Sequence, residues 1–299
     1  MTDNTNEIAS KYLGKKVEGS DRYNPTLIVP IPRCENRKQY NIDEKNLPFN
    51  GFDIWHAYEF SALTQGGIPF TRLLKIKYPC DSKFIAESKS LKLYLNSFNM
   101  TKFEETAEKS LEICRKIIEK DLSRNLQTTV QVYFINNLAK RVELFQNYQN
   151  IMEQIEEKNI VIDKFKEAPE YLEIENTENN KEYFLTFDSL RSNCRVTHQP
   201  DFGDVFIYYS SKKHINESSL VKYLTSFRTE YHFHEECCEM IFKRLKDILD
   251  NDDKLFVCAL YTRRGGIDIC PVRWTKNFIP KGIENLIDVE KFARHGVKQ

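Results

Sequence analysis

The chain has few glycines, and their placement excludes two common nucleotide-binding loops. None of its ten glycines lies between Gly67 and Gly203, and neither a GxGxxG nor a GxxxxGK[ST] pattern occurs. Those patterns let a backbone turn approach a phosphate closely. A dinucleotide would therefore have to be held in another way, by side chains from a sheet or an interface.

The sequence also lacks an excess of charge and a long apolar run. Its 299 residues include 44 lysines and arginines and 44 aspartates and glutamates, so the formal net charge is zero. A protein built to hold nucleic acid would carry a basic excess. No apolar run approaches the roughly 20 residues of a membrane helix, and the start MTDNTNEIAS lacks the features of a secretion signal. We expect a cytoplasmic protein with no direct nucleic-acid or membrane partner.

The eight cysteines form no CxxC pair and none of the regular zinc-finger spacings. In a reducing cytosol we expect free thiols, most of them small core residues. One or two of them should be chemically special.

Two segments of the chain are alike. Residues 90–98 (SLKLYLNSF) match residues 219–227 (SLVKYLTSF) in register at six positions. Apolar residues three and four apart predict a helix after each copy, over about 104–122 and 235–249. Strand-like runs flank the copies at residues 70–78, 128–134, 204–209 and 255–261, and a turn at 263–266 leads into a hairpin strand at 267–270.

This duplication predicts an α+β fold of two tandem modules, each with sheet strands and long helices packed on one face. Residues 140–185 are charged and free of glycine, which is typical of a connector. We therefore place the modules at residues 1–150 and 151–299.

The segment SNCRVTHQPD, residues 192–201, combines a thiol with cationic and acidic groups. A cysteine is a nucleophile as the thiolate, and its free pKa is about 8.5. Arg195, His198 and Asp201 are the neighbours that make such a thiol useful, and the flanking Pro200 and Gly203 predict a bend that presents Asp201. The alternative is a buried cysteine beside a surface turn.

The segment HFHEECC, residues 232–238, suggests either a metal site or a helix start. Its spacing is not a regular zinc pattern, and acidic residues are favoured at a helix N-terminus. Alternatively, Glu235 can accept two parallel N–H groups from a guanine-like edge, with Phe233 stacked on the ring.

Two further segments carry cations. Lys89 and Lys92 in residues 87–94 could meet phosphates, as could the arginines of Arg263-Arg-Gly-Gly266. Each is also compatible with a solvated surface. The second copy has no lysine at the position of Lys89, and the first has no counterpart of His234, as expected for halves that share one site.

Glu87-Ser-Lys-Ser-Leu-Lys-Leu-Tyr94 resembles the signature E-[S/L]-K-[S/A]-hydrophobic-K-[L/Y]-[Y/F/W] of the NADPH-dependent nitrile reductases called QueF, and meets every position. These are the 7-cyano-7-deazaguanine reductases of queuosine biosynthesis, a tRNA modification. Residues 47–55, 192–201, 233–235 and 261–266 also resemble the family, in order. The resemblance covers nearly the whole chain and is to the long, two-module form.

The resemblance implies two tandem tunnelling-fold (T-fold) modules, each an antiparallel sheet with two long helices on one face, and a homodimer or larger assembly. It implies metal-free reduction of the nitrile of 7-cyano-7-deazaguanine to the aminomethyl group by two NADPH. Cys194 would form a covalent thioimide, Asp201 would relay protons and His234 would assist. A thiolate adduct divides one difficult reduction into easier steps.

The resemblance also assigns binding residues. Those implied for the substrate are Ala86, Glu87, Ser88, Phe233, His234 and Glu235. Those implied for NADPH are Ser88, Lys89, Arg264 and Gly265, with Arg263 as an extension to the same phosphate region.

Three alternatives stay open on the residues alone. One is a cysteine nitrilase or amidase that uses the same thiol. Another is a GTP-cyclohydrolase-like zinc enzyme with His232, His234 and Cys237 or Cys238 as ligands. The last is a non-enzymatic tRNA-binding module, against which the zero net charge argues.

Overall fold

The computed structural model describes residues 20, 22–135, 141–156 and 160–294. The segment MTDNTNEIAS, and residues 140 and 157–159 of the expected connector, lie outside these ranges. Within them, no helix is both long and apolar enough to cross a membrane.

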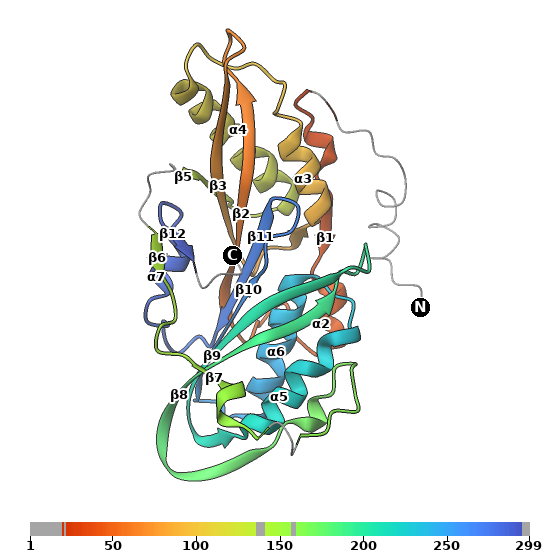
Figure 1. The fold of residues 1–299 in the computed structure, drawn as a ribbon, viewed down its shortest axis with the longest axis vertical. Coiled ribbons are helices and arrows are strands. Elements are labelled where there is room, and N and C mark those ends of the chain that lie inside the picture. The colour runs from red at the N-terminus through yellow and green to blue at the C-terminus, as the bar shows by residue number, and fades with distance from the viewer. Residues whose placement is uncertain (1–19, 21, 136–140, 157–159, 295–299) are drawn as a thin grey trace.

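One large sheet runs through the molecule (Figure 1). In the described ranges it has eight strands in the order β5-β3-β2-β11-β10-β9-β8-β7, antiparallel except for the β7–β8 pair. The strands are β2 (Asn50–Leu63), β3 (Pro69–Pro79), β5 (Gln131–Ile135), β7 (Gln149–Asn150), β8 (Ile174–Asn193), β9 (Pro200–Ile215), β10 (Lys254–Tyr261) and β11 (Ile267–Trp274). Because β2 pairs with β11, strands from both parts of the chain meet in the middle of one sheet.

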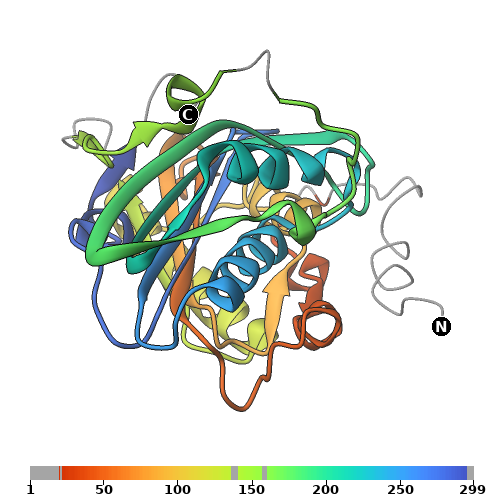
Figure 2. The ribbon, with the colours of Figure 1, turned by 90° about the horizontal axis from the view of Figure 1, so that it is seen from below.

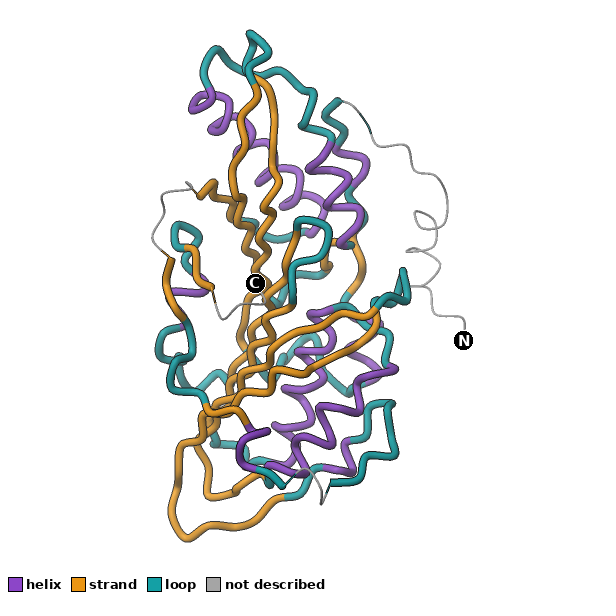
Figure 3. The backbone as a smooth tube through the Cα atoms, viewed as in Figure 1, coloured by secondary structure: helices purple, strands orange, loops and turns teal. Residues whose placement is uncertain are grey.

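Helices cover one face of this sheet (Figures 2 and 3). They are α3 (Ser88–Asn96), α4 (Ala107–Leu126), α5 (Glu217–Thr225) and α6 (His234–Ile248). In the expected stripe of α4, Cys114, Ile118 and Leu122 are fully buried against β2, β3 and β5, whereas Ala107 and Leu111 are partly buried. The α6 stripe, including Ile241 and Leu245, is buried against β8, β9 and β10. Each pair has one long helix and one of nine residues, not two long ones.

Short elements cover the opposite face. They are β6 (Arg141–Glu143), α7 (Ile283–Ile287) and β12 (Phe292–Arg294), which pairs with β6. Leu144, Ile283 and Leu286 pack there against outward residues of β9, β10 and β11. The remaining elements are η1 (Pro25–Leu27), β1 (Pro30–Pro32), α2 (Cys34–Gln39), β4 (Phe84–Ala86), η2 (Ile151–Gln154), η4 (Pro169–Tyr171) and η5 (Ser226–Thr229), with β1 paired to β4.

The two segments that match in sequence form matching helices. The Glu87 carboxylate caps α3 by accepting hydrogen bonds from the backbone N–H of Lys89 (3.0 Å) and Ser90 (2.6 Å). Asn216 caps α5 by accepting the N–H of Ser219 at 3.0 Å. A polar residue therefore begins the short helix in both places.

The expected connector was partly wrong, because strand β8 begins inside it at Ile174. Residues 174–176 and 181–182 pair with β9, but residues 174–182 are mostly exposed on both faces, so no alternating apolar pattern marks them. The expected bend at Pro200 and Gly203 was also wrong. Both residues lie within β9, and the chain turns before them, at residues 194–199.

Candidate active site

A hollow of about 270 Å³ lies beside the seam between β2 and β11. The expected residues that line it are Ala86, Ser88, Cys194, Asp201, Phe233, His234, Glu235 and Arg264. Its other lining residues are Trp55, His232 and Ile269. The hollow is therefore built from both parts of the chain, as the distribution of motifs between the two copies predicted.

The β8–β9 hairpin brings the thiol and the acid to one end of the sheet. Ser192 pairs with Asp201 in register, and Cys194 follows directly after β8. The Cys194 N–H donates to Gln199 O (2.8 Å), and His198 N–H donates to Cys194 O (2.9 Å) with a φ of 57° at His198. This tight turn leaves Cys194 only 6% exposed, at the wall of the hollow.

The other two expected neighbours of the thiol do not line the hollow. His198 is exposed and its ring contacts Tyr231. Arg195 is buried, and its guanidinium lies 3.3 Å from a Glu236 oxygen. Arg195 therefore ties the cysteine turn to α6.

Two side chains hold the Asp201 carboxylate. Arg264 Nη1 lies 2.7 Å from Oδ1, and His234 Nε2 lies 3.3 Å from Oδ2. The His234 ring in turn stacks on Tyr261, with centroids 3.8 Å apart and planes 11° apart. The carboxylate is thus oriented at both oxygens beside the hollow that contains the thiol.

Three buried polar atoms of the lining residues have no hydrogen-bond partner among the described residues. They are Glu235 Oε1, Trp55 Nε1 and His234 Nδ1. Buried polar atoms are nearly always paired in folded proteins. A ligand that offers both N–H donors and an acceptor would fit these atoms.

Glu235 has an unusual environment for a carboxyl group. It is 2% exposed, at the first turn of α6. Burial and the neighbouring Asp53 carboxylate raise the pKa of Glu235 to about 8, against the opposing effect of Arg33. Its ionisation is therefore sensitive to nearby charges.

His232 belongs to a separate buried cluster. Its Nε2 lies 3.0 Å from Glu230 Oε2, and its Nδ1 lies 3.4 Å from Glu236 Oε2. Burial opposes the charged imidazole, but these two carboxylates outweigh it and raise the pKa of His232. A histidine held in this way is a poor metal ligand, because both ring nitrogens are engaged.

The geometry does not support the zinc alternative. Cys237 and Cys238 are fully buried in the core, and burial raises the pKa of the Cys237 thiol to about 12. The group of described residues close enough to hold a metal is a different one, His56, Asp268 and Cys270. His56 contacts Phe292 of β12, away from the hollow.

The cysteines are free thiols, as expected. Burial raises the pKa of Cys80 to about 11 and that of Cys114 to about 12. Such thiols are inert. Cys194 differs because it lines a hollow.

Four of the residues expected to bind substrate or NADPH also lie outside the hollow. Glu87 caps α3, and Lys89 is exposed at the first turn of that helix. Arg263 lies over the Tyr58 ring, 4.5 Å from its centroid. Gly265 lines a second hollow of about 240 Å³, together with Glu59, Lys92, Asn96 and Gly266.

Trp55 and Ile269 were not expected at the site. They are direct register partners across the β2–β11 seam. Trp55 ends the motif at residues 47–55, which is the sequence signal that pointed to it. Ile269 carries no such signal, because its place depends on the pairing of distant strands.

Two family models match the chain. One is described as "Nitrile reductase, 7-cyano-7-deazaguanine-reductase N-term" and matches residues 20–134; the other is described as "QueF-like protein" and matches residues 200–278. The mixed α+β fold, the site and these matches define a nitrile reductase-type protein.

Several curated relatives are similar in sequence to this chain over most of their length. The NADPH-dependent 7-cyano-7-deazaguanine reductase of Rickettsia felis is 40% identical over 271 residues, 90% of this chain and 94% of the relative. Those of Legionella pneumophila and Colwellia psychrerythraea are 39% and 36% identical, over 88% and 90% of this chain and 89% and 93% of theirs. The chain belongs to the NADPH-dependent 7-cyano-7-deazaguanine reductase family.

Proposed function

We propose that this protein reduces the nitrile of 7-cyano-7-deazaguanine to the aminomethyl group of 7-aminomethyl-7-deazaguanine with NADPH, in queuosine biosynthesis. The observation that carries the proposal is that Cys194, Asp201 and Glu235 line one hollow. A nucleophile, a proton donor and an anchor for the base therefore face one bound molecule. The family to which the chain belongs has the same activity in its name.

Glu235 and Phe233 bind the deazaguanine ring. The unpaired Glu235 oxygen accepts N–H groups of the guanine-like edge, which requires the ionised carboxylate. Phe233 lies at the start of α6 beside it and offers an aromatic face. Ala86 and Ser88, with Glu87 between them, bring the β4–α3 junction to the lining of the same hollow.

Cys194 supplies the covalent step. Asp201 takes the proton of the Cys194 thiol, the sulfur adds to the nitrile carbon as one C–N π bond is lost, and Asp201 passes that proton to the nitrogen, giving a thioimide. Arg264 and His234 orient Asp201, and His234 assists the return of a proton. A positioned acid contributes about 10²–10⁴-fold.

The residues around the glycine turn fit NADPH. Gly265 has a φ of 57°, and a side chain there would collide with the Lys92 ammonium, so the turn requires glycine and the ammonium lies directly beside it. Lys89, Arg263 and Arg264 add positive charge for phosphates, and Ser88 lines the same hollow as Arg264. When bound, NADPH supplies the hydrides, two of which reduce a nitrile to an amine.

We also infer that the fold consists of two T-fold modules, residues 1–150 and 151–299, and that the chain acts as a homodimer in the cytoplasm. The matching helices α3 and α5 and their caps support the duplication. Eight free thiols support a reducing compartment. Sedimentation at twice the chain mass of 35.4 kDa tests the dimer.

The test combines intact-protein mass with NADPH oxidation at 340 nm. Incubation with 7-cyano-7-deazaguanine should add the mass of one substrate molecule, and turnover should consume NADPH. Cys194→Ala should abolish both, whereas Cys34→Ser, at a half-buried thiol in α2, should change neither. Formation of a carboxylic acid without NADPH oxidation would instead indicate a nitrilase.

A further inference from the structure

Strand β2 contains a bulge beside the glycine turn between β10 and β11. The register of β2 against β3 shifts between Ala57 and Phe60, so Tyr58 and Glu59 form this bulge. Bulges redirect side chains and are frequent next to active sites. Here the Tyr58 N–H donates to Gly266 O at 2.9 Å, which ties the bulge directly to the glycine turn.

The Tyr58 ring contacts one of the two arginines of that turn. Arg263 Cζ lies 4.5 Å from the ring centroid, within the roughly 6 Å of a cation–π contact. The neighbouring Arg264 instead pairs with Asp201 at 2.7 Å, beside the substrate hollow. Arg263 is exposed and forms no ion pair with a described residue, so its charge is available to an anion.

Buried polar groups fix the Tyr58 ring in turn. Its hydroxyl donates to Asp268 Oδ2 at 2.5 Å, and Asp268 Oδ1 lies 2.7 Å from His56 Nδ1. His56 and Asp268 are register partners across the β2–β11 seam, and each is 2% exposed. Phe292 makes T-shaped contacts with the rings of His56 and Tyr58, at 5.3 and 6.1 Å between centroids. The ring that contacts Arg263 is therefore held both by its hydroxyl and by its packing.

We propose that Tyr58 is a positioning residue for NADPH, because its ring holds the Arg263 guanidinium where that group binds a phosphate of the cofactor. The inference rests on the proposed function, in which Arg263 and Arg264 bind NADPH phosphates. A side chain that is ordered before binding loses less conformational freedom when the ligand arrives. Tyr58 lines neither of the two hollows, so it acts on NADPH through Arg263.

The experiment measures kcat and KM for NADPH by steady-state oxidation at saturating 7-cyano-7-deazaguanine. Tyr58→Leu removes the aromatic face and should raise the NADPH KM about 3–30-fold, with kcat within about twofold of the parent. Tyr58→Phe keeps the face and loses only the bond to Asp268, so its KM should rise no more than about twofold. In the Cys194→Ala protein, where binding is non-covalent, both substitutions should leave the Kd of 7-cyano-7-deazaguanine unchanged.

A double-mutant cycle tests whether Tyr58 acts through Arg263. In the Arg263→Met protein, Tyr58→Leu should cause no further loss of kcat/KM for NADPH, because the group that the ring holds is gone. Tyr171→Leu is the matched control. Lys164 Nζ lies 5.6 Å from the Tyr171 ring centroid and the Tyr171 hydroxyl donates to Asp163, but Tyr171 lines neither hollow, so the NADPH KM should not change.

The outcomes separate the two levels of the proposal. If the parent does not oxidise NADPH with 7-cyano-7-deazaguanine, the proposed function fails. If the parent does so, but Tyr58→Leu leaves the NADPH KM unchanged or lowers kcat/KM equally with and without Arg263, this inference alone is overturned.

A second comparison applies if Tyr58→Leu does not fold. Tyr58→Phe is then compared with the variant that carries pentafluorophenylalanine at the same position, because the two rings have a similar shape and differ in the charge of the ring face. The fluorinated variant should have the higher NADPH KM, and equal KM values would contradict a cation–π contact that holds Arg263.

Discussion

At the scale of single residues, the role we propose for Asp201 has the most clearly defined geometry. Both of its oxygens are held, by Arg264 and by His234. Asp201→Asn keeps the shape and the Arg264 contact but cannot act as an acid. We expect kcat to fall by about 10²–10⁴-fold with substrate Kd changed only a few-fold.

Stopped-flow NADPH oxidation and equilibrium binding measure the two quantities separately. Asp43→Asn, at an exposed acid outside the site, is the matched control and should keep the parent kcat. An Asp201→Asn enzyme with the parent kcat would remove Asp201 from the mechanism.

Gly51 is needed for the close approach of β2 and β11. A Cβ at this position would collide with the Val272 carbonyl oxygen and lie 2.9 Å from Arg273 Cδ. Gly51→Ala should therefore destabilise the fold by about 1–3 kcal/mol through overpacking. Denaturant unfolding measures the change.

Gly66→Ala is the control for Gly51→Ala. Its nearest neighbour would be Thr64 Oγ1, 3.9 Å away, and its φ is not in the left-handed region. Its effect should stay within about 0.5 kcal/mol. Equal effects of the two substitutions would show that the seam is not tightly packed.

At the scale of elements, sequence periodicity predicted what packs on one face. The stripes of α4 and α6 were recognised because Cys114, Ile118 and Ile241 recur at helical spacing and are buried. The start of β8 was missed, because a strand exposed on both faces leaves no alternation. A hydrophobic pattern marks buried residues. The α4 and α6 stripes have such residues, whereas the first residues of β8 are exposed, so the pattern predicted the helices and not the start of the strand.

The N-cap of α3 allows a structural role to be separated from a role at the site. Glu87→Ala removes the cap at Lys89 and Ser90 and should cost about 0.5–2 kcal/mol. If the segment of Ala86, Glu87 and Ser88 also binds the substrate, as we propose, KM should rise at least several-fold at temperatures where the protein is folded.

Thr106→Ala is the matched control, because Thr106 caps α4 through the N–H of Lys109 at 3.3 Å, away from the site. It should cost similar stability, measured by thermal unfolding, and leave KM unchanged. If Glu87→Ala, like Thr106→Ala, keeps the parent KM, Glu87 acts only as a helix cap.

At the scale of the whole molecule, the motifs contain most of the residues that line the hollow but do not show how the hollow is assembled. Cys194 and Asp201 lie close in sequence, and Phe233, His234 and Glu235 are consecutive. Each of these two groups could therefore be recognised from a short stretch of sequence. The hollow also needs Trp55 opposite Ile269, which results from the pairing of strands more than 200 residues apart. Register between distant strands is a property of the folded sheet, and no local pattern carries it.

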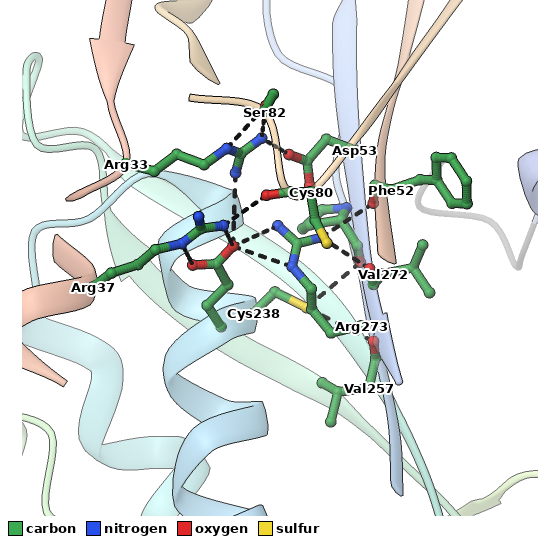
Figure 4. Close-up of polar contacts among 12 residues, drawn as sticks. Arg33, Arg37, Phe52, Asp53, Cys80, Ser82, Cys238, Val257, Val272 and Arg273 are labelled. Atoms are coloured by element: carbon green, nitrogen blue, oxygen red, sulfur yellow. Dashed lines mark hydrogen bonds and ion pairs between the residues drawn. The ribbon is translucent and has the colours of Figure 1, made fainter. Parts of the chain in front are cut away.

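The buried cluster of Arg33, Arg37, Asp53, Glu239 and Arg273 joins residues from distant parts of the chain and should control stability in acid (Figure 4). Burial disfavours the Glu239 carboxylate, but Arg37 and Arg273 outweigh it and lower the pKa of Glu239 to about 2. The unfolded value is about 4.3. Because the folded pKa is the lower one, this stabilisation is present above about pH 4.5 and is lost as the pH falls towards 2.

Urea unfolding between pH 7 and 2 should show this loss, on the order of 3 kcal/mol from Glu239 alone. Glu239→Gln should be destabilised at pH 7, because it leaves buried guanidinium groups unpaired, and should lose less further stability in acid. Glu112→Gln is the control: the Glu112 pKa is also lowered, by Arg115 and Lys116, but the group is fully exposed and screened by solvent. Its acid profile should match that of the parent, and a Glu239→Gln profile with the same slope as the parent would place the acid sensitivity outside the cluster.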